Sequence, residues 1–183
     1  LKGSSSEAMS VTVKWDGAPA VVCGTNPDNG KFFVGTKSVF AQAAKINYTK
    51  KDIATNHGTD ELGQKLLKCL VHLRKLNIQG VVQGDLLYTD EDITRKNIGG
   101  KPHLTFTPNT ITYAVPEEGD LAKQIDRAKV GIIFHTTYNG ETLADMTASG
   151  GADVSSFAKS NDVFFDNATY KDCLLYTSDA ADE

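Results

Sequence analysis

Leucines at helical spacing constrain the fold of this chain more than any other feature. They recur between Thr59 and Leu76, and the spacing places them along one face of a helix. Thr59 or Asp60 provides an N-terminal cap for such a helix. We therefore expect a helix over residues 59–76, whose apolar face consists of Leu62, Leu66, Leu67, Leu70, Leu73 and Leu76.

The segments on either side of this helix have the composition and alternation of β-strands. Turn residues separate them, most clearly in residues 26–30, Asn-Pro-Asp-Asn-Gly. Strands in hairpins with helices inserted between them are typical of an α+β fold with mostly antiparallel sheets. The predicted strands are residues 11–15, 20–23, 31–35, 81–87, 105–107, 110–115, 130–134 and 162–165, and a second, shorter helix is predicted at residues 121–129.

Composition excludes several classes of protein. The 183 residues suffice for one domain, and 40% apolar with 23% charged residues is ordinary for a soluble globular protein. A formal net charge of −4 argues against a generic polyanion binder, although a local basic cleft would still accept nucleic acid. The sequence has no signal-peptide pattern and no apolar run near the roughly 18 residues of a membrane span, so we expect a soluble, cytoplasmic protein. Cys23 and Cys69 lie in apolar surroundings and are interpreted as buried structural thiols.

The segment with the clearest chemical meaning is residues 14–17, Lys-Trp-Asp-Gly. Lys14 is predicted at the end of a strand that enters a tight turn, with Asp16 and Gly17 in that turn. An ordinary lysine, with a pKa of about 10.4, is protonated and unreactive at neutral pH. Burial beside other cations lowers that pKa and makes the amine a nucleophile. Gly17 allows the backbone to pass close to a ligand because glycine has no Cβ.

Four segments, in order along the chain, resemble motifs of the covalent nucleotidyltransferase superfamily, which includes ATP-dependent DNA ligases, RNA ligases and mRNA-capping enzymes. Residues 14–17 resemble its KxDG signature, and residues 35–38, Gly-Thr-Lys-Ser, resemble the next motif. Residues 83–87, Gln-Gly-Asp-Leu-Leu, resemble the third motif, and residues 111–115 resemble the strand whose aromatic residue stacks on the purine. The amino-acid sequence as a whole is most similar to those of tailed-bacteriophage proteins related to ligases. A protein of this kind would be located in the host cytoplasm.

The resemblance implies a truncated nucleotidyltransferase fold of the ligase adenylation-domain, ATP-grasp-like kind over residues 1–172. It also implies that a lysine attacks the α-phosphorus of ATP with the help of Mg²⁺, and that AMP then passes to the 5′ end of DNA or RNA. The resemblance implies catalytic roles for Lys14 and Asp16 and a metal-binding role for Asp85. The residues implied to bind the nucleotide are Lys14, Gly17, Lys37, Asp85 and Tyr113.

The chain also departs from the family. Pro19 stands where the family often has arginine, and Asp85 is shorter than the usual glutamate. The fourth and fifth motifs are missing, with Val130 where the glutamate of the fourth is expected, and we interpret this as truncation. Two alternatives therefore stay open: a GTP-using capping-type guanylyltransferase, and a non-catalytic nucleotide-binding or virion-associated relative.

Residues 173–183 resemble the translation of a sequencing-library transposon adapter, so we expect a non-native tail there. His135 ends a predicted strand and is interpreted as a structural hydrogen-bonding residue rather than a ligand-facing one. The lysines of residues 45–51 are interpreted as a solvated loop rather than a phosphate contact.

Overall fold

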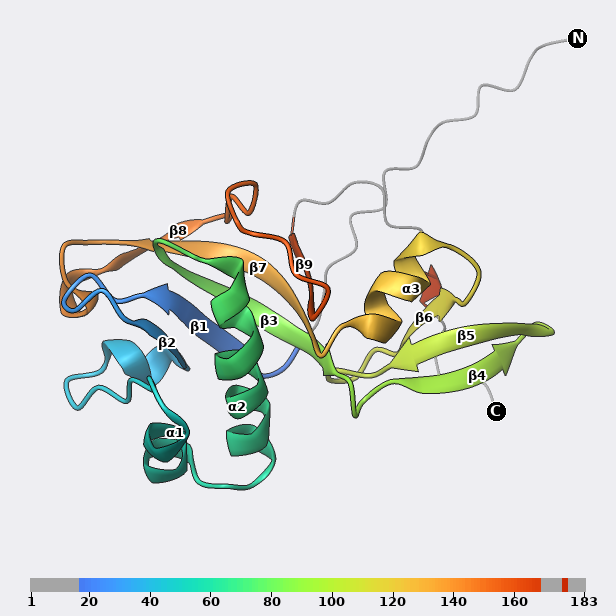
Figure 1. The fold of residues 1–183 in the computed structure, drawn as a ribbon, viewed down its shortest axis with the longest axis horizontal. Coiled ribbons are helices and arrows are strands. Elements are labelled where there is room, and N and C mark those ends of the chain that lie inside the picture. Colours follow the sequence, from blue (N-terminus) through green and yellow to red (C-terminus); the bar gives the residue numbers. More distant parts are fainter. Residues whose placement is uncertain (1–16, 169–175, 178–183) are drawn as a thin grey trace, which may run out of the picture.

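Two long neighbouring strands, β3 (Val81–Thr89) and β7 (Val130–Asn139), form the centre of the larger sheet (Figure 1). The computed structural model describes residues 17–168 and 176–177. The strand order is β2-β1-β3-β7-β8, and neighbours are antiparallel. β9 pairs with the first half of β7 and runs parallel to it. The remaining strands of this sheet are β1 (Ala20–Thr25), β2 (Phe32–Gly35), β8 (Thr147–Gly150) and β9 (Val163–Asn167).

The smaller sheet has the order β10-β6-β5-β4, and all its neighbours are antiparallel. Its strands are β4 (Thr94–Ile98), β5 (Lys101–Phe106), β6 (Tyr113–Pro116) and the short β10 (Tyr176–Thr177). Gly99 and Gly100 join β4 to β5, and both have the positive φ angles that glycine adopts most readily. This β4–β5 hairpin projects away from the larger sheet (Figure 1). The α+β class with mostly antiparallel sheets is therefore confirmed.

The leucine-rich segment forms α2 (Glu61–Leu73), which continues as the 3₁₀ helix η2 (Arg74–Leu76), as predicted. Leu66, Leu70 and Leu73 are buried against one face of the larger sheet, whereas Leu62 is 38% exposed. Cys23 and Cys69 belong to the same core, which confirms them as buried thiols. Burial raises the pKa of both thiols, that of Cys69 to about 12, so neither is ionised at neutral pH.

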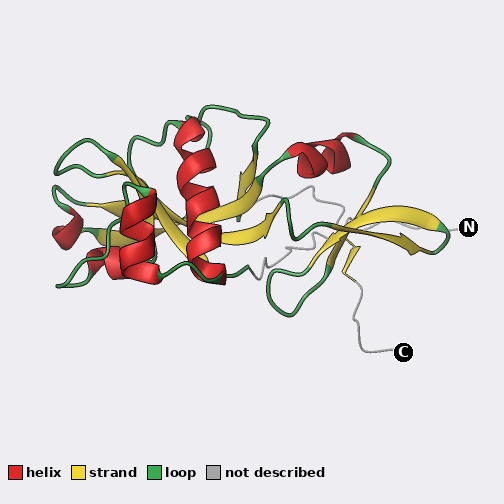
Figure 2. Ribbon diagram, turned by 60° about the horizontal axis from the view of Figure 1, so that its bottom comes forward, coloured by secondary structure: helices red, strands yellow, loops and turns green. Residues whose placement is uncertain are grey.

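A helix that the sequence analysis missed, α1 (Lys50–His57), packs beside α2 on the same side of the larger sheet (Figures 1 and 2). It occupies part of the segment expected to be a solvated loop. A capping box begins this helix: Thr49 Oγ1 accepts a hydrogen bond from Asp52 N, and the Asp52 carboxylate accepts one from Thr49 N. The backbone N–H of Tyr48 also donates to this carboxylate and is the main cause of its lowered pKa.

The smaller sheet packs against α3 (Asp120–Arg127) around a core of its own, which agrees with the predicted second helix. This core also takes Leu87 and Tyr88 from β3 and Ile133 from β7, so the central strands of the larger sheet contribute to it. Short 3₁₀ helices, η1 (Lys37–Phe40) and η3 (Leu143–Asp145), lie beside each other and pack with Val22, Phe33 and Val81 on the face of the larger sheet opposite α2. Within the described ranges, none of the helices is long and apolar enough to cross a bilayer.

Gly131 should be essential for packing where the two sheets meet. A Cβ at this position of β7 would overlap the ring of Tyr88, which is almost fully buried and donates a hydrogen bond to Ile125 O. We expect Gly131→Ala to lower the free energy of unfolding by about 1–3 kcal/mol, because the buried ring has nowhere to move. Denaturant titration measures this value. Gly150→Ala is the matched control, since a Cβ at Gly150 meets open space, and equal stabilities of the two variants would contradict the packing argument.

Candidate functional site

Polar side chains from β3 and β7 lie on the face of the larger sheet away from α2. Val82 and Leu86 pack on the helix side, so strand alternation directs Gln83 and Asp85 to the opposite face. Their neighbours there come from β7. We call this group the polar strip; it consists of Gln83, Asp85, His135, Thr136 and Tyr138.

A β-bulge in β7 places both His135 and Thr136 on the face that carries Asp85. Gly84 pairs with Phe134 and Gln83 pairs with Thr136, so His135 is the extra residue between them. Its Nε2 lies 3.2 Å from Asp85 Oδ1, and its Nδ1 lies 2.7 Å from Thr136 Oγ1. The His135 and Asp85 side chains are 30% and 25% exposed, so the pair is held in place yet open to a ligand. The interpretation of His135 as a hydrogen-bonding residue is confirmed, and its partner is the carboxylate expected to bind nucleotide or metal.

Gln83 and Tyr138 form the more enclosed end of the polar strip. The Tyr138 hydroxyl donates to Gln83 Oε1, and Gln83 is 5% exposed. Burial raises the pKa of the Tyr138 hydroxyl, so the hydroxyl stays neutral and remains a donor. The Tyr138 ring packs 4.4 Å from the ring of Phe40, centroid to centroid, which fixes its position from η1.

Gly17 lies directly against Asp85. A Cβ at Gly17 would come 2.6 Å from Asp85 Cβ and 2.8 Å from Leu86 O, closer than van der Waals contact permits. The following residues continue along β3: Ala18 N donates to Leu86 O, and Leu86 N donates to Pro19 O, both at 3.1 Å. The peptide bond between Ala18 and Pro19 is cis. The structure therefore brings the end of the Lys-Trp-Asp-Gly segment onto the third motif-like segment.

Lys37 lies just beyond the end of β2 that is beside the start of β1. It is the exposed first residue of η1, and Thr36 separates it from β2. Gly35 of β2 pairs with Val22 of β1, and Val22 pairs with Gln83. Thr36 caps η1 by accepting a hydrogen bond from Ser38 N, which orients the short segment that carries Lys37. The second motif-like segment thus begins at Gly35, two strands away from Gln83 of the polar strip.

Tyr113 is not brought to the polar strip. It lies on β6 of the smaller sheet, with 0% of its surface exposed, and its ring stacks on that of Phe106 at 5.5 Å. Its role in stacking on a purine stays a prediction, and it requires this ring to be uncovered. Lys14 and Asp16 lie outside the described residues. Among the described residues, His, Cys, Asp and Glu side chains form no group of three that converges as a metal site.

Sequence reasoning singled out Asp85 and His135 separately but did not pair them, and it missed Tyr138. The contact between His135 and Asp85 depends on the register of β3 against β7, which leaves no distinct sequence signal here. Tyr138 was passed over because the predicted strand ended at Phe134, whereas β7 continues to Asn139. The threonines and tyrosine of residues 136–138 are strand-forming residues and were the available signal for that extension.

Comparison with known proteins places the chain in a sequence family. Residues 1–181 match the sequence family described as Family of unknown function (DUF6267). The chain belongs to this family. The DUF6267 match takes in the polar strip, both sheets and β10, and runs into residues 173–181; an adapter origin of residues 173–183 stays a prediction. No curated protein and no solved structure matches the chain.

The bond between Tyr138 and Gln83 should contribute to stability. Tyr138→Phe removes the hydroxyl and leaves the Gln83 amide oxygen buried without this donor, so we expect a loss of about 1–2 kcal/mol in the free energy of unfolding. A double-mutant cycle with Gln83→Met provides the control, because this second substitution removes the amide oxygen left without a donor. If the two losses in free energy of unfolding are additive in the double variant, the hydrogen bond does not contribute to stability.

Proposed function

We propose that this chain is a nucleotidyltransferase of the nucleic-acid ligase kind, in which Lys14 takes AMP from ATP and passes it to a nucleic-acid 5′ end. The observation that carries the proposal is the contact of Gly17 with Asp85. Segments that are far apart in the sequence, and that resemble the first and third motifs of one superfamily, meet at one place. Lys37, from the segment that resembles the second motif, follows the end of β2 that lies beside the start of β1.

The reaction needs an amine close to this place. Lys14 precedes Gly17 by three residues, which span at most about 11 Å, so covalent geometry allows the amine to reach the surroundings of Asp85. In the proposed step the neutral amine attacks the α-phosphorus, a P–N bond forms, and the bond to the β-phosphate oxygen breaks. Pyrophosphate leaves, and the amine gives up a proton. A 5′-phosphate then attacks the same phosphorus and releases the lysine.

Asp85 fits a supporting role in that step. Its carboxylate is partly exposed, and within the described residues its side-chain hydrogen bond comes from His135 to Oδ1. Mg²⁺ commonly binds one or two protein carboxylates together with substrate phosphates, so Asp85 would hold the ion, which neutralises charge on the phosphates. His135 positions the carboxylate, and Lys37 is available to a phosphate because its side chain lies at the surface.

One observation favours the non-catalytic alternative. Tyr113, the residue expected to stack on the base, is enclosed in the core of the smaller sheet. A virion-associated relative that keeps the fold without binding nucleotide would not need an uncovered Tyr113. Covalent labelling separates the two functions, because a non-catalytic protein retains no label after denaturation.

Lys14→Ala should abolish covalent labelling of the chain. Incubation with α-labelled ATP and Mg²⁺, followed by denaturation, measures the retained label, and a parallel incubation with α-labelled GTP identifies the base. We expect Asp85→Asn to reduce labelling at least about tenfold, because the carboxylate charge near the phosphates is lost. Lys51→Ala, on the exposed face of α1, is the control and should label normally. Undiminished labelling of Lys14→Ala would exclude the mechanism, and a folded chain without label would favour the non-catalytic relative.

Gly17→Ala should impair labelling by displacing Asp85 or the segment that leads to Lys14. The added methyl group overlaps Asp85 Cβ and Leu86 O, so either the carboxylate or the segment that leads to Lys14 has to move. A displacement of about 1 Å costs roughly a hundredfold in rate when it misplaces reacting groups. The rate of labelling is compared with that of Gly80→Ala, whose added methyl group meets open space. Equal rates for the two variants would show that the close contact has no part in the reaction.

A further inference from the structure

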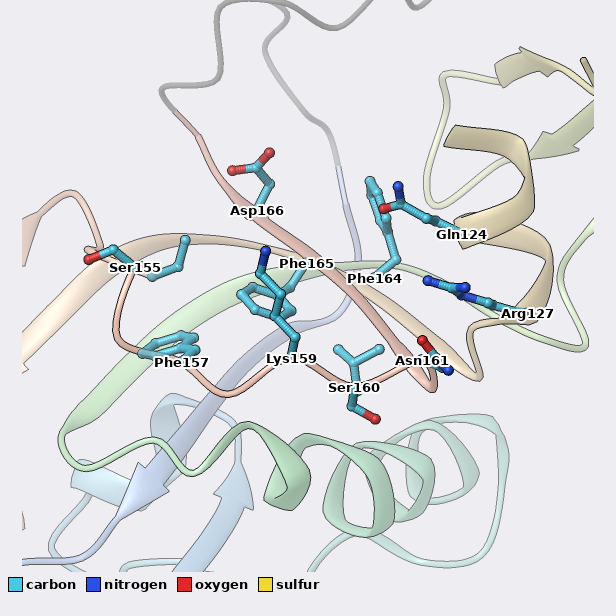
Figure 3. A pocket seen from close by; sticks show the side chains of 12 residues that line it. Gln124, Arg127, Ser155, Phe157, Lys159, Ser160, Asn161, Phe164, Phe165 and Asp166 are labelled. Carbon is cyan, nitrogen blue, oxygen red and sulfur yellow. The ribbon is translucent and has the colours of Figure 1, made fainter. Parts of the chain in front are cut away.

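A cavity of about 560 Å³ lies between α3, β9 and the loop that connects β8 to β9 (Figure 3). None of the side chains that line it belongs to the polar strip. Its volume falls within the range of small-ligand sites and suffices for a single nucleotide. Its lining combines cations with aromatic rings.

The cations are Arg127, at the end of α3, and Lys159, in the loop before β9. A backbone bond from Lys129 N to Asp162 O, 2.7 Å long, ties the end of α3 to this loop. Both cations are exposed, and neither forms an ion pair within the part of the chain that the structure describes. Neighbouring cations such as Lys75 are neutralised by carboxylates. Arg127 and Lys159 are therefore available to an anion.

The aromatic rings are Phe164 and Phe165 of β9 and Phe157 of the preceding loop, all half-buried. Phe165 packs on Phe157 and Phe134, with ring centroids 5.9 Å and 6.4 Å apart. Phe164 packs on the core of the smaller sheet, on the other side of the strand. The rings are thus held rigidly by the cores behind them, while their remaining surface lines the cavity.

A carboxyl, Asp166, also lines the cavity, at a distance from Arg127. It lies near the far end of β9 from Asp162, the residue that Lys129 N ties to the end of α3. Figure 3 shows Asp166 and Arg127 on different sides of the cavity, with the Lys159 amine between them. Burial raises the pKa of the Asp166 carboxyl, which weakens its repulsion of an anion. The electrostatics therefore direct the negative group of a ligand to the space between Lys159 and Arg127, away from Asp166.

We propose that this cavity is a second site, which binds a nucleoside phosphate unit with its phosphate on Arg127 and Lys159 and its base against Phe164. Rigid aromatic surface beside free cations is the combination that binds unpaired nucleotides, because bases stack on rings while cations hold the backbone. The unit is part of a nucleic-acid strand or a free nucleotide, which share this chemistry. Taking it as the acceptor strand rests on the proposed function; the site itself does not.

Binding of a fluorescent, 5′-phosphorylated single strand of about four nucleotides to the full chain tests the proposal by anisotropy. We expect Arg127→Ala with Lys159→Ala to weaken binding at least about tenfold. The slope of log affinity against log salt should fall by roughly 0.7 for each cation that holds a phosphate. The matched control is Lys51→Ala with Lys123→Ala, which removes the same charge from exposed positions outside the cavity. Equal affinities of the two double variants would overturn the proposal.

Phe164→Leu tests the ring separately, because leucine keeps apolar bulk against the core while removing the stacking surface. We expect it to weaken binding about fivefold or more, with the salt slope unchanged.

Competition experiments distinguish a free nucleotide from a strand. If AMP displaces the fluorescent strand, and no longer does so in the Arg127→Ala and Lys159→Ala double variant, the cavity binds free nucleotide. If only the unlabelled strand displaces it, the cavity binds a strand. Covalent labelling at Lys14 is measured on the same variants. If the cavity variants lose strand binding and the unsubstituted chain is never labelled, the proposed function is excluded and the cavity site is supported. If the chain is labelled and the cavity variants bind the strand normally, the cavity site is excluded and the proposed function is supported.

Discussion

The pairing of β3 with β7 is the interaction on which the rest of the structure depends. The side chains are buried on both faces for most of β3 and for the first half of β7. Val82 and Leu86 contribute to the core under α2, whereas Leu87 and Tyr88 contribute to the core of the smaller sheet. Because both cores use the same pair of strands, neither sheet keeps its packing if this pair separates. The close fit of Gly131 under the Tyr88 ring is where the two cores meet.

The same pairing creates the candidate site. Phe134 packs on the α2 side, so strand alternation places His135 on the open face, where it meets the carboxylate. The extra residue in β7 then keeps Thr136 on the open face as well, opposite Gln83 and beside His135. Gly17 then approaches from β1 because it lacks a side chain. The site therefore combines a register shift with a close backbone approach, and both are features of tertiary structure.

These features explain how much of the protein could be predicted from its sequence. The helix over residues 59–76 and the strands from β1 to β9 that alternate or run apolar were predictable, because burial of one face imposes a period on the sequence. β4 was missed because none of its residues is buried and so no period arises. α1 was missed because its apolar face is small, although Thr49 and Asp52 carry the capping signal. A motif resemblance singled out Gly17 and Asp85, which the structure brings together, while the partnership of Asp85 with His135 was not predictable, since it depends on the register of β3 against β7.

The β4–β5 hairpin bears on how this protein behaves when it is crowded. β4 has one hydrogen-bonded neighbour among the described strands, so its outer edge offers backbone groups to another chain. The strand is short and carries Arg95 and Lys96, and Arg95 is held by Glu117 and Asp126. Charged residues on a short edge oppose the stacking of one molecule's strand on another's. The projecting arm is thereby protected against self-association at its most exposed backbone, and its charge serves solubility more than the fold itself.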